Sequence, residues 1–269
     1  MSIRSLPDRP LPDRSLPGRT LPGRSLPGRR LRVVDWVLRR LSCGGSSVEA
    51  EVAALDDLLA EGDVCCDIGA SFGLYTLAAA RSVGPTGRVL AFEPLAGPRR
   101  FLAQSVRWLR ATNVEVHPEA LGDERRAARM SLPTRRGLPV PGRAFVADHA
   151  NGLGSNLEFA HQRSVEVGVS KLDSVVEQRQ LHRVDLVKID VEGYELAVLR
   201  GAARTLRRFH PVVLLEIEDR HLARFGADSS MVVDAMAGYG YRMHALVDGR
   251  WQAMDAVTDR RRNYLFVPG

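Results

Sequence analysis

From Val48 onward the chain alternates between short apolar runs and segments in which apolar residues recur every three or four positions. Apolar runs bounded by Gly, Pro and Asp predict buried strands, and the longer spacing predicts helices. The expected strands are Val64–Ile68, Arg88–Phe92, Val114–His117, Leu186–Ile189, Val212–Ile217, Tyr241–Val247 and Asn263–Val267. The expected helices between them are Phe72–Arg81, Pro98–Arg110, Tyr194–Phe209 and Ser230–Ala237.

Repeated strand–helix units predict an α/β fold with a mostly parallel sheet covered on both faces. No helix separates the last two strands, so we expect them to form an antiparallel hairpin at the edge of the sheet. Residues 124–172 interrupt the alternation with Pro, Gly, Arg and alternating stretches such as Ser164–Val169. This pattern predicts an inserted hairpin or lid, and such insertions usually shape a substrate site.

The chain begins with five copies of a pentamer of the type Ser-Leu-Pro-Gly-Arg, between Ser5 and Arg29. Proline in every unit prevents helix and sheet, and one Leu per unit buries too little surface to offset the entropy of ordering. We therefore expect a disordered tail over residues 1–30, a short helix and linker over residues 31–47, and one folded domain over residues 48–269. The tail is either a weak tether to acidic partners or, as we favour, a low-complexity extension.

The net charge of +6 arises from the basic residues at the start of the chain. Residues 1–40 hold ten Arg against three Asp, so the remaining residues sum to −1. The domain therefore lacks the basic surplus of a nucleic-acid-binding surface. No apolar run approaches the roughly 20 residues of a membrane span, and the basic start lacks the apolar core of a secretory signal. We expect a soluble, cytoplasmic protein.

Three cysteines are present, Cys43, Cys65 and Cys66. The adjacent pair is hard to bridge, and no Cys or His companion stands at the spacing of zinc ligands. We expect reduced thiols and assign no metal.

The strongest local motif is Asp67-Ile-Gly-Ala-Ser-Phe-Gly73, between a predicted strand and a predicted helix. A glycine turn at this place puts backbone N–H groups against a ligand at the carboxyl edge of the sheet. A dinucleotide loop would read G-x-G-x-x-G, whereas here the glycines are Gly69 and Gly73 and an acid precedes them. Asp67 suits a cationic or hydroxyl-bearing ligand better than a pyrophosphate. The alternative is an ordinary glycine-rich turn.

The second strand ends in Ala91-Phe-Glu-Pro94. An acid at this tip can accept hydrogen bonds from both ribose hydroxyls of a nucleoside, so Glu93 indicates a nucleoside without specifying which one. The alternative for Glu93 is a solvated carboxylate at the end of a strand.

These motifs resemble those of the FkbM family of methyltransferases, which have the Rossmann-like class I fold and use S-adenosylmethionine. The resemblance runs from about Val64 to about Tyr241. Four matches carry it: Asp67–Gly73, Ala91–Pro94, Val169-Ser-Lys-Leu-Asp173, and Asp185-Leu-Val-Lys-Ile-Asp-Val-Glu-Gly193 followed by Glu195. The resemblance implies a sheet of seven strands. It also implies that Asp67, Gly69, Ala70, Ser71 and Gly73 hold the methionine part of the cofactor, Glu93 and Pro94 the ribose, and the turn ending at Asp123 the adenine edge.

Charged residues lie at the end of the fourth predicted strand and just beyond it. Period-two alternation places Lys188, Asp190 and Glu192 on one side while the backbone stays extended, and Gly193 releases the turn. Transfer of a methyl group to an alcohol needs in-line approach and a proton acceptor. Asp190 is therefore the first candidate for base or substrate anchor, unless Lys188 simply pairs with one of the carboxylates.

Glu216 ends the fifth predicted strand, whose tip adjoins that of the fourth, so it can join Asp190 around the acceptor or around a divalent ion. Two or three acids are weak grounds for a metal, which we leave unassigned. His221 is a further base candidate, although a histidine in a charged stretch is more often at the surface. Gly154-Ser155-Asn156-Leu157 resembles a family segment that lines the site, and turn chemistry explains it equally well.

The leading hypothesis is O-methylation of a small-molecule hydroxyl, with the O-methyl outcome implied by the resemblance. A nicotinamide-dependent oxidoreductase is disfavoured by the missing G-x-G-x-x-G and by the absence of a Tyr-x-x-x-Lys pair. An RNA methyltransferase or nucleic-acid binder recruited by the tail is disfavoured by the charge of the domain. A non-catalytic family member is disfavoured by the intact loop at Asp67–Gly73. The acceptor and the oligomeric state are left open.

Overall fold

The computed structural model describes residues 50–152, 156, 159 and 161–269. The predictions for the N-terminal repeat, for residues 31–47 and for Cys43 lie outside the described residues. So do Gly154, Ser155 and Leu157, whereas Asn156 is described.

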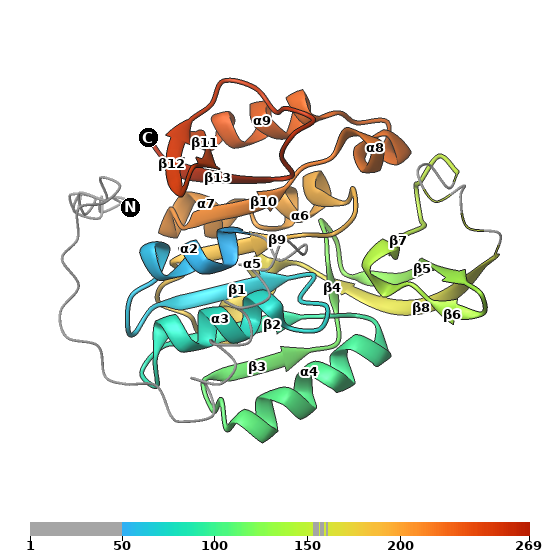
Figure 1. Ribbon diagram of the computed structural model, residues 1–269, viewed down its shortest axis with the longest axis horizontal. Helices are drawn as coiled ribbons and strands as arrows, with labels where there is room; N and C mark the ends of the chain where they lie inside the picture. The colour runs from blue at the N-terminus through green and yellow to red at the C-terminus, as the bar shows by residue number, and fades with distance from the viewer. Residues whose placement is uncertain (1–49, 153–155, 157–158, 160) are drawn as a thin grey trace, which may run out of the picture.

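A twisted sheet forms the centre of the domain, with strand order β12-β11-β13-β10-β9-β1-β2-β3 (Figure 1). Its strands are β1 (Val64–Ile68), β2 (Arg88–Phe92), β3 (Val114–His117), β9 (Leu186–Ile189), β10 (Val212–Glu216), β11 (Tyr241–Val247), β12 (Arg250–Ala253) and β13 (Asn263–Pro268). The five strands from β3 to β10 run parallel. β13 is antiparallel to both β10 and β11. The predicted Rossmann-like α/β sheet with an antiparallel edge is confirmed.

Helices cover both faces of this sheet. One face carries α2 (Ala50–Leu58), α3 (Leu74–Val83) and α4 (Ala96–Leu109), and the other carries α5 (Leu172–Gln178), α6 (Glu195–Gly201), α7 (Ala203–Phe209) and α9 (Ser229–Gly238). Alternation along β1 separates the two cores, because Cys65 packs with α2 and α3 whereas Cys66 packs on the opposite face.

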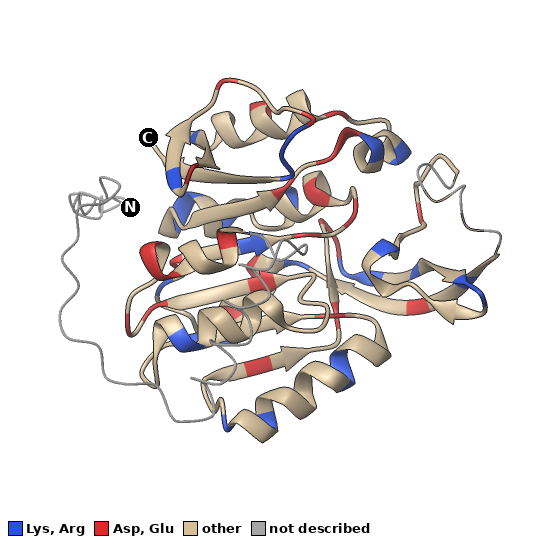
Figure 2. Ribbon diagram, in the orientation of Figure 1, with Lys and Arg blue, Asp and Glu red and all other residues tan. Residues whose placement is uncertain are grey.

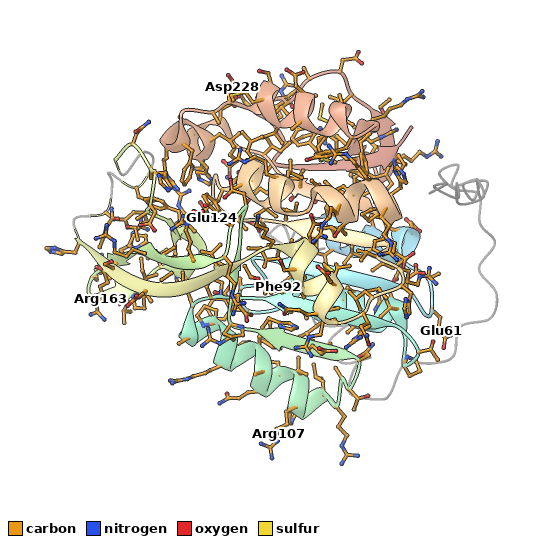
Figure 3. The ribbon with its side chains drawn as sticks, turned by 180° about the vertical axis from the view of Figure 1, so that it is seen from behind. Glu61, Phe92, Arg107, Glu124, Arg163 and Asp228 are labelled. Carbon is orange, nitrogen blue, oxygen red and sulfur yellow. The ribbon has the colours of Figure 1, made fainter. Side chains whose placement is uncertain are left out.

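The molecule seen from behind shows interior and surface positions. Phe92 lies in the middle of the molecule, and Arg107 and Arg163 lie at its surface (Figure 3).

The segment after β3 forms a second sheet, of order β4-β8-β5-β6 with β7 paired to β5. Its strands are β4 (Ala120–Leu121), β5 (Arg126–Arg135), β6 (Leu138–Pro139), β7 (Phe145–Val146) and β8 (His161–Ser170), and the short helix η1 (Pro141–Arg143) precedes β7. β5 and β8 form a long antiparallel pair. The predicted inserted hairpin is confirmed, and it projects from one end of the central sheet, at the right of Figure 1.

The central sheet has one strand more than the seven predicted. β12 returns from β11 through Asp248 and Gly249, and Val247 pairs with Arg250 across this turn. Both turn residues have positive φ, as in a two-residue type I′ hairpin. Because Asp-Gly is a strong hairpin motif, this strand was visible in the sequence, and its omission from the predicted strands is an error.

The helix predicted over Tyr194–Phe209 is divided at Ala202 into α6 and α7. The Asp173 carboxylate accepts hydrogen bonds from the backbone N–H groups of Arg204 and Thr205, at 3.0 and 2.8 Å, and so caps the start of α7. A capping residue so distant in sequence leaves no mark on the apolar periodicity of the segment. The division could therefore not be predicted locally.

Acidic and basic residues are interspersed along the elements of the domain (Figure 2). Two short helices, α8 (Asp219–Leu222) and η3 (Ala223–Phe225), follow β10 in the chain and precede α9. No helix among the described residues is long and apolar enough to cross a membrane.

Candidate active site

A cavity of about 410 Å³ lies at the carboxyl ends of β1, β2, β9 and β10. The insert closes part of it through Met130, Val146 and the η1 region. The predicted site residues that line the cavity are Gly69, Ser71, Glu93, Pro94, Asp190, Glu192 and Glu216. The predicted residues outside its lining are Asp67, Ala70, Gly73, Asp123 and Lys188.

The loop after β1 is held against β2 and β9 by its backbone. The N–H groups of Gly69 and Ala70 both donate to the carbonyl of Phe92, at 3.0 Å. A Cβ on Gly69, whose φ is +82°, would lie 1.8 Å from the carbonyl oxygen of Asp190. A Cβ on Gly73, at φ +92°, would lie 2.4 Å from the Leu102 side chain. Gly69 is therefore required by contact with the backbone as well as by conformation, whereas at Gly73 the positive φ is the main requirement, because the end of the Leu102 side chain can shift.

Asp67 lies beneath this loop rather than in the cavity. Its buried carboxylate accepts a hydrogen bond from the Thr76 hydroxyl in α3. Burial raises the pKa of Asp67 to about 6, against the lowering effects of Thr76 and of the nearby Lys188. The side chain therefore joins β1 to α3 and supports the loop from below.

Glu93 occupies the tip of β2, as predicted from the sequence. Its two carboxylate oxygens accept hydrogen bonds from the N–H groups of Ser71, at 2.9 Å, and Leu95, at 2.8 Å. Burial raises its pKa to about 7 despite these two hydrogen bonds. Each carboxylate oxygen can accept more than one hydrogen bond, so Glu93 keeps capacity for a hydroxyl-bearing ligand in the cavity.

The turn from Ala120 to Asp123 contributes only its first two residues to the cavity. Asp123 instead accepts hydrogen bonds from the Arg200 guanidinium, at 2.8 and 2.9 Å. Glu119 does line the cavity, and among the described residues its buried Oε2 has no hydrogen-bond partner. Glu119 was not among the site residues predicted from the sequence. The only indication in the sequence was that it is an acidic residue just after the third predicted strand.

Asp190 and Glu216 lie together at the ends of β9 and β10. Glu216 keeps its proton, because burial and then the charge of Asp190 raise its pKa far above the ordinary value, and it shares a hydrogen bond with Asp190. The pKa of Asp190 is lowered: burial opposes this, but the charge of Lys188 and the hydrogen bond with Glu216 outweigh it. Lys188 is buried, 3.4 Å from Asp190, with its ammonium 4.8 Å from the centre of the Tyr75 ring.

The predicted shared side for Lys188, Asp190 and Glu192 is therefore only partly realised. Lys188 points to the α3 face, where it forms the ion pair with Asp190 that was the alternative interpretation of this motif. Glu192 has left the extended conformation, with φ +55°. Because the period-two rule ends where the strand ends, it could not place this residue.

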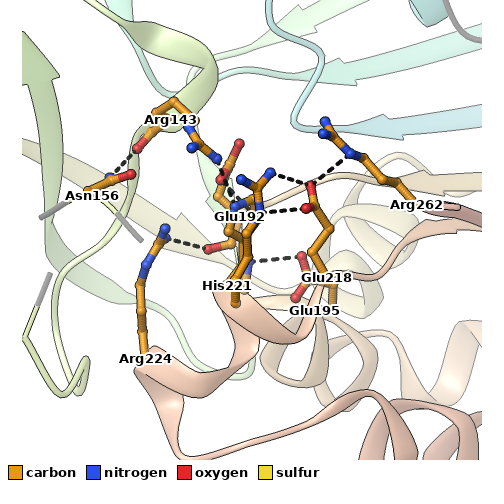
Figure 4. Close-up of polar contacts among 10 residues, drawn as sticks. Arg143, Asn156, Glu192, Glu195, Glu218, His221, Arg224 and Arg262 are labelled. Carbon is orange, nitrogen blue, oxygen red and sulfur yellow. Dashed lines mark hydrogen bonds and ion pairs between the residues drawn. The ribbon is translucent and has the colours of Figure 1, made fainter. Parts of the chain in front are cut away.

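Glu192 instead meets two residues that are remote in sequence. His221 Nδ1 lies 3.0 Å from Glu192 Oε2, and Arg143 from the insert lies 3.0 Å from His221 Nε2 (Figure 4). His221 is only 3% exposed, so its expected surface position is wrong. Arg143 had no sequence pattern that set it apart from the other arginines.

Beyond the end of β10, Glu218 and two arginines form a further cluster of charged side chains at the cavity. Glu218 accepts hydrogen bonds from Arg220, at 2.5 and 2.9 Å, and lies 3.4 Å from Arg262 (Figure 4). All three line the cavity. In the part of the chain that the structure describes, no group of three or more His, Cys, Asp or Glu is arranged to hold a metal ion.

Comparisons with known proteins identify the family of the chain. Residues 67–243 match the family model described as the methyltransferase FkbM domain. The chain is 28% identical over 247 residues to the AMB antimetabolite synthetase AmbE of Pseudomonas aeruginosa, covering 81% of this chain and 11% of AmbE. It is 32% identical over 143 residues to Methyltransferase 1 of Beauveria bassiana, covering 50% of this chain and 56% of the relative. The chain thus spans about a tenth and about half of these two relatives.

Among solved structures, a methyltransferase FkbM from Methylobacillus flagellatus is similar, with a TM-score of 0.48 and 18% identity, over 78% of this chain and 44% of that one. The family model covers well over half of the chain and spans both the loop at Asp67 and the turn at Glu192. The chain belongs to the FkbM family of methyltransferases.

Proposed function

We propose that the protein transfers a methyl group from S-adenosylmethionine to a hydroxyl group of a sugar, a polyketide or another small metabolite. The arrangement of the cavity carries this proposal: Glu93 stands at the end of β2, and Asp190 and Glu192 stand beyond the end of β9, with β1 between. A nucleoside cofactor needs an acceptor for its ribose hydroxyls, and an alcohol needs an acceptor for its proton.

The residues present fit such a cofactor. The glycine loop brings backbone to the cavity edge, and Glu93 retains acceptor capacity there. Within the described chain, the buried Oε2 of Glu119 makes no hydrogen bond and can accept one from an amino group on a base. The volume of about 410 Å³ falls within the roughly 300–1,000 Å³ of small-molecule sites.

In this proposal Gly69, Ala70, Ser71 and Gly73 shape the loop around the methionine part of the cofactor, and Asp67 supports that loop through Thr76. Glu93 and Pro94 border the ribose. The turn from Glu119 to Asp123 borders the adenine, and Glu119 is the stronger candidate for a direct contact because Asp123 is paired with Arg200.

When bound, S-adenosylmethionine supplies an electrophilic methyl group on a positively charged sulfur, which becomes a neutral thioether as the acceptor oxygen takes the methyl group. The residues of this chain must then orient the hydroxyl, accept its proton and keep water out. Asp190, Glu192 and Glu216 are the carboxyl groups at hand, with Lys188 offsetting the charge of Asp190. The insert covers the cavity from outside.

Small metabolites are the acceptor class that we favour. The name of the Pseudomonas relative, an antimetabolite synthetase, supports this choice. Because the chain belongs to a methyltransferase family, the alternative hypothesis of a nicotinamide-dependent oxidoreductase is no longer supported. The mixed charges of the domain disfavour RNA, which would need a basic surface.

Isothermal titration of the full-length protein with S-adenosylhomocysteine and, separately, with NADH tests the cofactor. We expect binding of the first alone, and binding of NADH alone would contradict the proposal. Methyl transfer from labelled S-adenosylmethionine to a panel of sugars and polyketide alcohols then tests the acceptor. Each alcohol has its O-methyl ether as the matched control, and we expect label only in the free alcohols. Transfer to amines or to RNA instead would contradict the hydroxyl assignment.

A further inference from the structure

Glu192 and His221 form a buried pair at the wall of the cavity. Their side chains are 13% and 4% exposed, and 3.0 Å separates Glu192 Oε2 from His221 Nδ1. The pair joins the turn after β9 to α8 (Figure 4). Glu192 also lines the cavity, the space that an acceptor would occupy.

Arg143 determines where His221 carries its proton. The guanidinium of Arg143 lies 3.0 Å from His221 Nε2, and a guanidinium can only donate hydrogen bonds. Nε2 therefore accepts, and in a neutral ring the proton resides on Nδ1, on the side of Glu192 Oε2. Burial lowers the pKa of His221 to about 4, opposed by the charge of Glu218 and reinforced by three nearby arginines, so the ring is neutral at neutral pH.

Both ends of this chain of contacts are fixed. The carbonyl of Arg143 accepts a hydrogen bond of 2.7 Å from Asn156, which is fully buried. The carbonyl of Glu192 accepts one of 3.0 Å from Arg224, whose guanidinium lies 4.3 Å from the centre of the Phe145 ring. A Cβ on the next residue, Gly193, would lie 2.4 Å from the carbonyl oxygen of His221, so the turn packs directly on α8.

Glu192 is better suited than Asp190 to accept a proton. Asp190 has a lowered pKa and already interacts with Lys188 and Glu216. Burial and then the charge of Asp190 raise the pKa of Glu192 to about 8. A general base works best when its pKa is near the working pH.

We propose that Glu192 accepts the proton of the acceptor hydroxyl, and that His221, held as the Nδ1–H tautomer by Arg143 of the insert, is the positioning residue that orients Glu192. The inference rests on the proposed function. The proton moves from the hydroxyl to Glu192 as the oxygen forms its bond to the methyl group and the bond from methyl to sulfur breaks. His221 keeps its own proton throughout, and Arg143 keeps its charge.

Charged groups from several elements act on Glu192 and enter its titration. These are Asp190 after β9, Glu195 in α6, Glu216 at the end of β10, Arg143 in η1, Arg220 and His221 in α8, and Arg224 in η3. Among the described residues Glu192 Oε2 has no hydrogen-bond partner, and His221 Nδ1 lies 3.0 Å from it, at ion-pair distance rather than in hydrogen-bond geometry. Removal of His221 should raise the pKa of Glu192, because a polar N–H beside a carboxylate favours its charged form.

The first test needs no cofactor and no acceptor. Nitrogen-15 NMR of the full-length protein distinguishes the two ring nitrogens of His221, assigned by comparison with His221→Asn. We expect a neutral ring with its proton on Nδ1 at neutral pH, and loss of this preference in Arg143→Ala. A proton on Nε2, or a charged ring at neutral pH, would overturn the positioning role.

The second test measures methyl transfer against pH. Glu192→Gln should lower turnover roughly 100-fold or more, the usual scale for loss of a general base, with S-adenosylhomocysteine affinity retained. His221→Leu should move the midpoint of the pH–rate profile to higher pH, and His221→Asn, which keeps an N–H near the position of Nδ1, should restore it. The exposed residues Glu177 and His182 supply the matched controls Glu177→Gln and His182→Leu.

Two results would overturn the inference while leaving the proposed function intact. One is wild-type turnover in Glu192→Gln. The other is a His221→Leu protein that is slower at every pH with an unmoved midpoint, which a merely structural role predicts. Failure of the wild-type protein to methylate any hydroxyl would instead overturn the proposed function and the base role together.

Discussion

A Cβ atom on Gly69 would lie 1.8 Å from the carbonyl oxygen of Asp190, so the loop after β1 and the turn after β9 are in direct backbone contact. The loop proposed to hold the cofactor and the turn that carries the carboxylates therefore form one unit. A substitution that moves the backbone of the loop is expected to move the backbone of the turn as well, and the reverse.

Gly69→Ala tests this contact. The new methyl group meets the carbonyl of Asp190 and forces a side chain into φ +82°, so we expect a loss of unfolding free energy of about 2 kcal/mol or more. Urea denaturation measures it. Gly137→Ala is the matched control, because Gly137 has φ +79° and a Cβ there would have no atom within 4 Å. Equal losses in the two variants would mean that the backbone contact is unimportant.

Glu93→Ala tests the ribose assignment. Loss of a charge-assisted acceptor should weaken binding of S-adenosylhomocysteine by about 1–3 kcal/mol, as measured by calorimetry. Asp123→Ala is expected to leave affinity nearly unchanged, since Asp123 pairs with Arg200 and does not line the cavity. Wild-type affinity in Glu93→Ala would argue against the site as assigned, and a large effect of Asp123→Ala would restore Asp123 as an adenine contact.

Asp173→Ala tests the cap that separates α6 from α7. The carboxylate accepts from the N–H groups of Arg204 and Thr205 and from the Thr205 hydroxyl. Its removal should lower the unfolding free energy by roughly 1–2 kcal/mol, the usual scale for an N-cap. Glu177→Ala, which breaks an exposed contact of 3.3 Å with the Arg204 side chain, should change it by less than about 0.5 kcal/mol. The reverse order would show that Asp173 does not act as the cap.

Glu216→Gln tests the proton shared with Asp190. The pKa of Glu216 is raised in the folded protein, so its contribution to stability is full below the ordinary carboxyl pKa and declines as pH rises toward the folded value. A glutamine amide donates to Asp190 without needing a proton. Relative to wild type, Glu216→Gln should therefore gain stability between about pH 5 and about pH 9. Denaturation curves at several pH values, with Glu177→Gln for comparison, measure this difference, and parallel curves for wild type and Glu216→Gln would exclude a shared proton.

Much of the central sheet could be predicted because each strand is an apolar run that ends in turn residues. The bounds of β1, β2, β3 and β9 agree with the predicted ones residue for residue. The same local chemistry indicated the glycine loop and the acid at Glu93. β12 is absent from the predicted strands although Asp248-Gly249 indicates its turn, so that omission was one of interpretation.

Other features depend on contacts that no local pattern contains. The division at Ala202 follows from Asp173, and the position of Lys188 follows from the face of the sheet that α3 covers. His221 stands in a charged stretch that suggests a surface position. It is buried because α8 packs against the turn at Gly193.

The sequence by itself determined the order of most strands and helices, the loop at Asp67–Gly73 and the family, since these rest on apolar periodicity and on short motifs. Only the tertiary structure decided that Arg143, His221 and Glu192 meet, that Glu119 rather than Asp123 borders the cavity, and that Asp190 and Glu216 share a hydrogen bond. The physical reason is that burial, hydrogen-bond partners and pKa values depend on which distant segments pack together.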